Sequence, residues 1–449
     1  MQVISIARFT FPLLMVASMA CAAAPPQGSL LTVDQQRVDR VAVSLLHDPG
    51  VEAARAAGLK KWSTLPAFSL RDGKDTLDGA IQEAEYAALR AVAAYEPGKP
   101  PLIWASAPPY TFAKVKVPGS RYAGDNPDRI YRSIAVDPAH RYEIHGRRAT
   151  KPSNDDFLFE AISGPALGLI GTPTASLKAK DIDVAADGAF TVTADASPAN
   201  GRRNHLTLPA GTTGILLRDT LADWSAQRPN DIVVKRLDAE AGTARSQDEL
   251  HQQAAQEVSR FIDANIRFLD LVTKAPVNHP VAQVRRPQDG VAGAIAASGR
   301  FSLKGDEVLV ITIDPAGAKY VGFQLTDPWF RSRPYWSTTG SLSNRQVKTN
   351  ADGSLTYIVA PRDPGYHNWL SSGGLHDGLL LIRIEDFDQT PDPAKVIREA
   401  RVVSLAQLGS VLPAETVRVT LAERAQQLHV RYVGYLKRVE LPPTRAESH

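Results

Sequence analysis

From about residue 120 onward, the sequence is divided into short apolar or alternating runs that are separated by turn residues. The runs RYEIHG (141 to 146), AFTVTAD (189 to 195) and GILLRD (214 to 219) have the length and alternation of half-buried strands. Asp187-Gly188, just before the second run, is typical of a tight turn. Strands at this spacing, without a helix after each one, predict antiparallel sheets rather than a β-α-β arrangement.

The same pattern continues in the second half of the chain after one long helical segment. VLVITID (308 to 314), LTYIVAP (355 to 361) and GLLLIRIED (378 to 386) are apolar enough to lie within a sheet. The segment from 247 to 273 instead repeats apolar residues at helical spacing. Its predicted buried face consists of Leu250, Ala254, Val258, Phe261 and Phe268.

Helices are also predicted at both ends of the chain. Asp34 is placed to cap a helix whose apolar face carries Val38, Val41 and Leu45. A second helix is predicted over residues 75 to 95, before the Pro- and Gly-rich break that starts at residue 96. The C-terminal helix is predicted from a repeat of Leu421, Ala425, Leu428, Tyr432 and Leu436.

These patterns together predict an α+β chain that is mainly β. Its core is expected to be an antiparallel β-sandwich or jelly-roll-like fold with N-terminal, middle and C-terminal helices. The expected divisions are a signal peptide (1 to 22), a helical N-terminal region (23 to 115), a first β-rich half (116 to 240), a connecting helix (241 to 275), a second β-rich half (276 to 390) and a C-terminal helical region (391 to 449).

The first 22 residues have the three-part layout of a secretory signal peptide. Arg8 supplies the positive charge, residues 9 to 17 are apolar, and Ala20-Cys21-Ala22 matches an A-x-A cleavage site. The apolar part is shorter than the roughly 20 residues that a membrane-spanning helix needs. The sequence therefore predicts a periplasmic or secreted protein that is cleaved near Ala22.

Cys21 is the only cysteine of the chain, and it lies in the predicted signal peptide. The exported protein is therefore expected to have no free thiol. Cys21 is either removed with the signal peptide or retained as the lipid-anchored first residue of a lipoprotein. The preceding Ser18-Met19-Ala20 matches a lipoprotein signal poorly, which favours removal. Apart from this residue, the composition excludes disulfides, thiolate catalysis and thiolate metal sites.

Composition and motifs exclude several further classes of protein. The formal net charge is +3 and no long basic run occurs, so nucleic-acid binding is not expected. No further apolar stretch is long enough for a transmembrane segment in the mature chain. The chain has no G-x-S-x-G elbow, no P-loop, and no G-x-G-x-x-G fingerprint at a strand-to-helix turn. No cofactor is expected, and the oligomeric state stays open.

Three blocks in the β-rich part carry a resemblance to a known family. They are GDNPDRIYRSIAVDPAHRYEIHG (124 to 146), HLTLPAGTTGILLRDTLADW (205 to 224) and DGSLTYIVAPRDPGYHNWLSSGGLHDG (352 to 378). In this order they resemble the bacterial domain-of-unknown-function family numbered twelve-fourteen. Members often have Asp-Thr where this chain has Ser371-Ser372. The resemblance implies a jelly-roll-like fold and no established reaction. Relatives are associated with bacteria that degrade steroids, alkanes and other hydrophobic compounds.

The segment from Asp363 to Gly378 is the strongest candidate site. His367 and His376 are candidate acid–base groups, and Asp363 and Asp377 are carboxylates that could orient them. Asn368 and Trp369 are candidate ligand-binding residues. The same histidines and carboxylates are acceptable metal ligands, but their spacing matches no metal signature, and no metal is expected. A structural role in the turn and core is the alternative.

Two other clusters are candidate ligand-binding sites. In the first, Arg218 could hold an anionic group beside Trp224, or could pair internally with an acid such as Asp219. In the second, QLTDPWFRSRPYW, Gln324, Trp329 and Trp336 could line a cleft, although burial in the core is the commoner fate of such aromatics.

Three hypotheses for function follow from these features. The leading one is an exported protein that binds a small apolar or amphipathic compound, steroid- or lipid-like, in a degradation pathway. Whether the protein also transforms this compound as an enzyme is left open. The second is a carbohydrate-binding or carbohydrate-active protein, because aromatic shelves near carboxylates suit sugars. The third is a non-enzymatic scaffold of the cell envelope.

Overall fold

The computed structural model describes residues 30–440 except 97, 150–151, 165–169, 239–244, 287–290 and 292. The predicted signal peptide and Cys21 lie outside these residues and stay predictions. The described chain contains more strand than helix, with several mainly antiparallel sheets and helices before, between and after them. The predicted α+β class, mainly β, is therefore confirmed. No helix in the described part is both long and apolar enough to cross a membrane.

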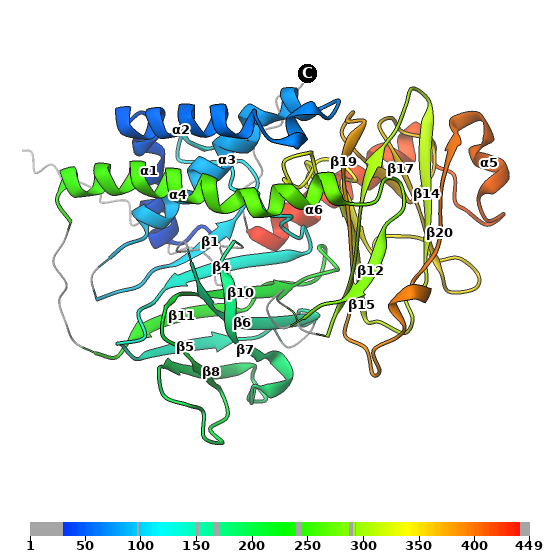
Figure 1. Cartoon of the computed structure of the whole chain (residues 1–449). Helices are drawn as coiled ribbons and strands as arrows, with labels where there is room; N and C mark the ends of the chain where they lie inside the picture. Colours follow the sequence, from blue (N-terminus) through cyan, green and yellow to red (C-terminus); the bar gives the residue numbers. More distant parts are fainter. Residues whose placement is uncertain are drawn as a thin grey trace, which may run out of the picture.

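Two β-sandwiches form the body of the molecule (Figure 1). In the first, a five-stranded sheet packs on a four-stranded sheet around a core that includes Ile134, Phe159 and Val192. The larger sheet has, in spatial order, β1 (Leu102–Ser106), β4 (Arg129–Ala135), β10 (Thr212–Thr220), β6 (Asp156–Ser163) and β7 (Thr172–Lys178). The smaller has β11 (Asp231–Arg236), β5 (Tyr142–Arg147), β8 (Ala189–Asp195) and β9 (His205–Thr207).

The second sandwich is built in the same way around its own core, which includes Ile311, Phe323 and Ile382. Its larger sheet has β12 (Val281–Val284), β13 (Ile295–Ser302), β19 (Asp377–Glu385), β15 (Tyr320–Leu325) and β16 (Ser341–Ser343) in that order. Its smaller sheet has β18 (Trp369–Ser371), β17 (Leu355–Ala360), β14 (Glu307–Ile313) and β20 (Ile397–Ser404). All six runs predicted as strands are strands.

The two sandwiches repeat one strand topology. Each strand from β4 to β11 has a counterpart nine strands later, from β13 to β20, with the same neighbours in its sheet. The parallel pairs match as well, β8 with β9 and β17 with β18. Thr220 lies opposite the first residue of β6, and Glu385 lies opposite the first residue of β15. Arg218 lies two residues before Thr220 in β10, and Arg383 lies two residues before Glu385 in β19. The two arginines therefore occupy equivalent positions in the two sandwiches.

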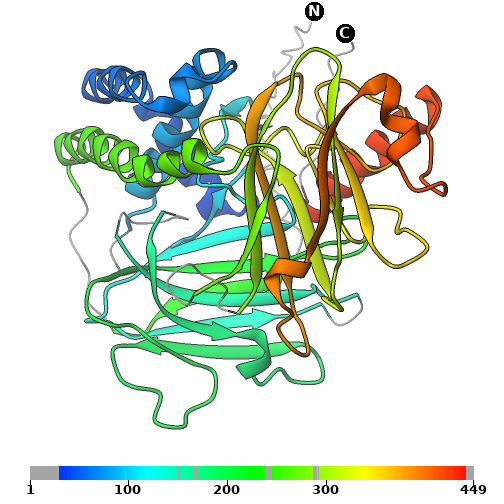
Figure 2. The same cartoon turned by 45° about the vertical axis from the view of Figure 1, so that its right-hand side comes forward.

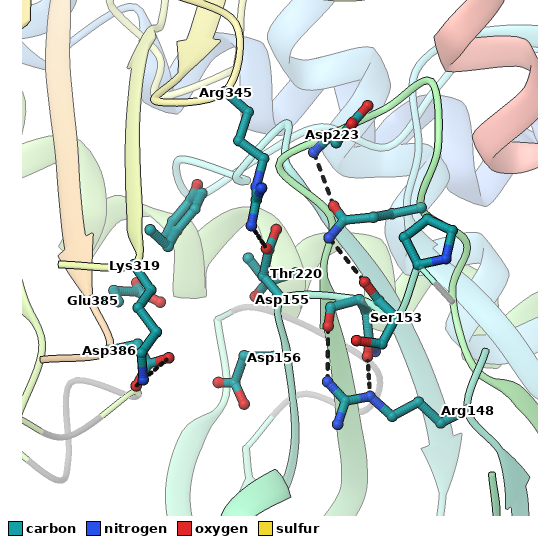
Figure 3. Close-up of a pocket in the computed structure, with 14 residues that line it drawn as sticks. Arg148, Ser153, Asp155, Asp156, Thr220, Asp223, Lys319, Arg345, Glu385 and Asp386 are labelled. Carbon is teal, nitrogen blue, oxygen red and sulfur yellow. Dashed lines mark hydrogen bonds and ion pairs between the residues drawn. The ribbon is translucent and has the colours of Figure 1, made fainter. Parts of the chain in front are cut away.

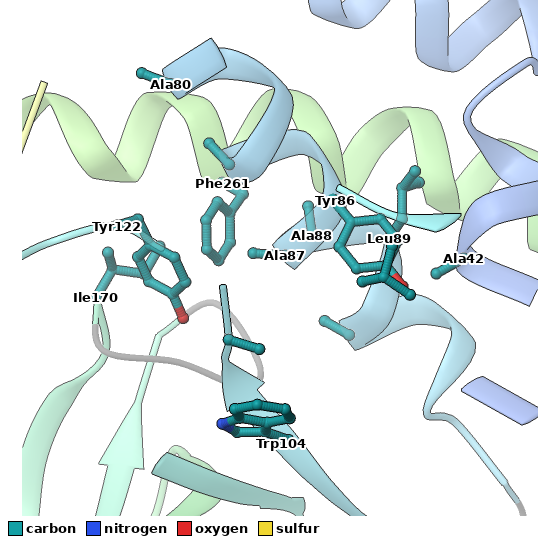
Figure 4. Close-up of a cluster of buried hydrophobic side chains, with 14 of the residues drawn as sticks. Ala42, Ala80, Tyr86, Ala87, Ala88, Leu89, Trp104, Tyr122, Ile170 and Phe261 are labelled. Carbon is teal, nitrogen blue, oxygen red and sulfur yellow. The ribbon is translucent and has the colours of Figure 1, made fainter. Parts of the chain in front are cut away.

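Four long helices pack beside the sandwiches (Figures 1 and 2). They are α1 (Val33–Leu45), α2 (Pro49–Trp62), α3 (Gly73–Ala93) and α4 (Gln247–Lys274). The third apolar core lies among these helices and against the first sandwich; Figure 4 shows Tyr86 and Leu89 of α3, Phe261 of α4, and Trp104 of β1 within it. Tyr122 meets Phe261 edge to face, with ring centroids 5.0 Å apart.

The remaining elements complete the chain. They are the hairpin β2 (Tyr110–Phe112) and β3 (Val115–Val117), the single turns η1 (Pro66–Ser69), η2 (Ala179–Asp181), η4 (Pro393–Lys395), η5 (Leu405–Gln407) and α5 (Leu408–Val411), and the C-terminal helix α6 (Leu421–Val439). Strands thus begin at residue 102, within the N-terminal region (23 to 115) that was expected to be helical. The strand β20 likewise lies within the C-terminal region (391 to 449) that was expected to be helical.

Helix caps explain where two of the helices begin. The Thr32 side chain accepts a hydrogen bond from the backbone N–H of Gln35, so Thr32 rather than Asp34 caps α1. Asp48 caps α2 in the same way, and Pro49 follows as the first helical residue. The sequence analysis did not predict α2, although this Asp-Pro pair is a helix-start signal.

The buried face of α6 differs from the predicted one. The predicted face includes Leu421, which is 88% exposed. The residues that α6 buries are Arg424, Arg431, Gly434, Tyr435, Arg438 and Val439. The guanidinium carbons of Arg431 and Arg438 lie 4.0 and 4.3 Å from the ring centre of Trp224. Stacking on an aromatic ring and hydrogen bonding to carbonyl groups lets arginine occupy positions that apolar periodicity assigns to leucine.

A buried ion pair fixes α1 to α3. Asp39 and Arg90 have side chains 0% and 1% exposed, and Arg90 Nε lies 3.0 Å from Asp39 Oδ1. Tyr86 Oη donates to the same oxygen at 2.8 Å, and Tyr110 Oη donates to Oδ2. The carboxylate is therefore fully hydrogen-bonded in a place where an unpaired charge would be very unfavourable.

Candidate ligand-binding cavities between the sandwiches

The first half of the Asp363–Gly378 segment anchors α6. Asp363 forms an ion pair with Arg424, with Nε and Oδ2 2.8 Å apart. Asn368 is buried and bonds the backbone N–H and C=O of Lys348 and the C=O of Thr356. His367 Nε2 lies 3.3 Å from the carbonyl of Gln346, and burial lowers the pKa of this imidazole.

The second half of the segment contacts the start of α3 and the second sandwich. Asp377 pairs with Arg300 at 2.7 Å. The backbone N–H groups of His376 and Asp377 both donate to Asp72, and His376 Nδ1 lies 3.0 Å from the carbonyl of Leu303. Of the four candidate catalytic residues, only His376 and Asp377 share a partner, Asp72, and none of the four lines either cavity described below.

The side chains of the candidate tryptophans also contact other parts of the protein. The Trp224 indole N–H donates to Asp128 at 2.9 Å, and that of Trp329 donates to the carbonyl of Gly73 at 2.8 Å. Trp336 lies under the guanidinium of Arg121, and Trp369 donates to the carbonyl of Ala360. Within the described residues, no group of three or more His, Cys, Asp or Glu side chains is arranged to hold a metal ion.

The larger cavity between the sandwiches, called the acidic cavity here, has a volume of about 700 Å³ (Figure 3). Its walls come from the start of β6, the end of β10, the start of β15 and the end of β19. Four of its charged residues pair with each other: Arg345 with Asp155 at 2.7 Å, and Lys319 with Asp386 at 3.3 Å. Asp156 is different, because it has no ion-pair partner among the described residues.

Burial and the neighbouring carboxylate of Glu385 raise the pKa of Asp156 to about 6. Between the usual value of 3.8 and pH 6, the folded state keeps a proton that the unfolded chain has lost, so stability falls as pH rises through this range. Asp156→Asn removes this effect. We expect a gain on the order of 1–2 kcal/mol in the free energy of unfolding at pH 7 and none at pH 3.5, measured by urea denaturation. An equal gain at both pH values would contradict the titration.

The second cavity, called the arginine cavity here, has a volume of about 510 Å³ and lies on the other side of Glu385. It is lined from both sandwiches and from α4. Six guanidinium groups contribute to its described lining, those of Arg129, Arg218, Arg267, Arg285, Arg286 and Arg383. Glu385 is the one carboxylate in that described lining, so positive charge predominates.

Two of these arginines are neutralised by buried acids. Arg129 forms an ion pair with Glu385, and Arg218 lies 2.7 Å from Glu160. The pKa of Arg285, in the same lining, falls to about 10. Burial is the main cause, and the guanidinium groups of Arg383 and Arg218 add to it. A bound anion would relieve this crowding of like charges.

Arg383 is held in place by neutral acceptors. It donates to Gln324 Oε1 and to the carbonyl of Gly124, both at 2.5 Å. Gln324 is itself fixed, because its amide donates to the carbonyl of Asp125 at 2.7 Å. Of the predicted ligand-binding residues, the structure thus places Arg218 in the cavity and Gln324 behind it as a positioning residue.

One wall of the arginine cavity is apolar. Phe268 and Phe330 stack with ring centroids 6.2 Å apart, and Leu381 lies beside them. Gly124 has a left-handed φ of +67°, and a Cβ there would lie 2.8 Å from Leu381 and 3.0 Å from Phe330. Glycine therefore lets the backbone carbonyl that holds Arg383 lie against this wall.

The sequence analysis missed five of the six arginines. The usable signal was the repeat itself, because GILLRDT (214 to 220) and LLLIRIE (379 to 385) place an arginine at the same point of equivalent strands. The others come from α4, from the two residues that follow β12, and from the start of β4, and no motif connects these segments.

Comparisons with known proteins show the fold. The structure is similar to a crystal structure of an uncharacterized protein from Burkholderia cenocepacia, with a TM-score of 0.64 and 24% identity, covering 81% of this chain and 99% of that one. A Vibrio parahaemolyticus protein of 10% identity matches 79% of this chain and 99% of its own, with a TM-score of 0.39. No family model and no curated protein matches the chain. The fold is therefore similar to that of an uncharacterized bacterial protein; membership in family twelve-fourteen stays a prediction.

Proposed function

We propose that the protein binds a small amphipathic organic anion in the arginine cavity. The observation that carries this proposal is the convergence of arginines from both sandwiches, Arg218 and Arg383, next to the stacked rings of Phe268 and Phe330. Guanidinium groups recognise carboxylate, sulfate or phosphate, and the apolar wall accepts a hydrocarbon part. A volume of about 510 Å³ lies within the range of small-molecule sites.

The charge of the two cavities favours the arginine cavity over its neighbour. Arg345 and Lys319 of the acidic cavity already pair with carboxylates, so they offer little to a ligand. Arg383 instead bonds only neutral partners in the described part of the chain, so its charge is available to an anion. Neutral sugars would leave this charge uncompensated, and we therefore prefer an anion to a carbohydrate.

The proposal includes the exported, periplasmic location and the relationship to family twelve-fourteen. Both rest on residues of the sequence alone, the first on residues 1 to 22 and the second on the blocks at 124–146, 205–224 and 352–378. A lipid- or steroid-derived acid from a degradation pathway fits the chemistry of the site, since it joins an apolar body to one anionic group.

Binding of decanoate tests the proposal. We expect saturable binding to the full chain in calorimetry and a loss of about tenfold or more in affinity in Arg383→Gln, because one charge-assisted hydrogen bond contributes roughly 1.5–3 kcal/mol. Arg398→Gln is the matched control, since Arg398 also lies in the second sandwich but pairs with Asp314 on the surface. Its affinity should equal that of the wild type.

Two results would overturn the proposal. One is the absence of binding by decanoate, decyl sulfate and decyl phosphate to the wild-type protein. The other is equal affinity of the wild type and Arg383→Gln for the anion that binds, when both variants show the same thermal unfolding and circular dichroism.

A further inference from the structure

Two arginines of the cavity, Arg383 and Arg267, are connected through the residues of its apolar wall. Arg383 is half-buried and bonds the carbonyl of Gly124. Gly124 contacts Phe330, because its N–H donates to the Phe330 carbonyl at 2.8 Å. Phe330 stacks on Phe268, and the guanidinium of Arg267 lies over the Phe268 ring, 4.8 Å from its centre. These contacts form a continuous row from the inner arginine to the outer one.

Neither guanidinium group at the ends of this row, that of Arg267 or that of Arg383, forms an ion pair with a carboxylate of the described residues. Arg267 donates to the carbonyl of Ile170, and Arg383 donates to an amide and a carbonyl. Arg267 is exposed, whereas Arg383 is half-buried, so one lies at the mouth and the other inside. The ring pair between them presents no charge.

We propose that the natural ligand carries two anionic groups joined by an apolar spacer. This inference rests on the proposed function, because it names the class of anion that the same cavity takes. The inner anionic group is held by Arg383, the spacer lies on Phe268 and Phe330, and the outer group is held by Arg267. An α,ω-dicarboxylic acid, or a hydrophobic acid that carries a second acidic substituent, has this chemistry.

A comparison of decanedioate with decanoate in calorimetry tests the inference. We expect the wild type to bind the diacid about fivefold or more tightly than the monoacid, the size of effect that one exposed ion pair gives. In Arg267→Gln, the ratio of the two affinities should fall to about one, because the group proposed to hold the outer anion is removed. Arg383→Gln should weaken both compounds. A series from hexanedioate to dodecanedioate finds the best spacer length.

Arg260→Gln is the matched control, because Arg260 lies on the same helix and outside the cavity lining. It should keep the wild-type preference for the diacid. Equal affinity for monoacid and diacids of every length in the wild type would overturn the two-group ligand and leave the proposed function intact. So would an unchanged ratio in Arg267→Gln. Failure of every acid to bind would instead overturn the proposed function itself.

Discussion

Asp39→Asn should lower the free energy of unfolding by about 3–5 kcal/mol, the usual effect of leaving one member of a buried ion pair without its partner. The amide has nearly the size of the carboxylate, so the packing between α1 and α3 is kept. Arg90, 1% exposed, would remain charged with its counter-ion removed. The hydroxyl groups of Tyr86 and Tyr110 would also lose a charged acceptor. Urea denaturation at pH 7 measures the change.

Asp34→Asn is the control on the same helix. Asp34 pairs with Lys99 at 3.3 Å, and the lysine side chain is 63% exposed, so the expected loss is below about 1 kcal/mol. A second check removes both buried charges in Asp39→Leu/Arg90→Met, which should be more stable than Asp39→Asn because no uncompensated charge remains. If Asp39→Asn costs no more than Asp34→Asn, the buried pair does not stabilise the junction of α1 and α3.

Trp329→Ala should cost about 3–5 kcal/mol, as expected when a large aromatic ring is removed from a core. Trp329 is 2% exposed and stacks on Trp62, with ring centroids 5.5 Å apart. Its indole N–H also donates to the carbonyl of Gly73 at the start of α3. The variant therefore removes contacts that join the second sandwich to two helices. Thermal and urea unfolding of the full chain measure the loss.

Trp336→Ala distinguishes this packing role from a ligand shelf. Trp336 is half-buried beneath Arg121, so the expected loss is below about 2 kcal/mol. Neither ring lines the arginine cavity, and decanoate affinity should be unchanged in Trp336→Ala and in folded Trp329→Ala at low temperature. A stable Trp329→Ala that fails to bind decanoate would restore Trp329 as a ligand-binding residue.

The strands could be predicted because their signal is local. AFTVTAD corresponds residue for residue to β8, since alternation and the Asp187-Gly188 turn are written in adjacent positions. The buried face of α6 could not be predicted, because Arg431 and Arg438 stack on Trp224 and donate to carbonyl groups in distant parts of the chain. Burial of charge depends on partners that periodicity does not reveal.

The candidate site shows the same division. Arg218 was a candidate anion-binding residue with an internal ion pair as the alternative; the structure places it in the lining of the arginine cavity and pairs it with Glu160. Its partner Glu160 was not foreseen, because the two meet through pairing of β10 with β6. Asp363 and His367 stood out for their chemistry, but titratable residues in a conspicuous loop also serve to hold a helix, as Asp363 holds Arg424 here.

The repeated strand topology makes this chain the covalent counterpart of a pair of like subunits, with the contact between the sandwiches in place of a subunit interface. In a true dimer a single codon would supply both Arg218 and Arg383, and the two guanidinium groups would have identical surroundings. Within one chain they are free to diverge. Arg218 pairs with an acid, whereas Arg383 bonds neutral partners, so the two equivalent positions present different net charge to a ligand in the cavity.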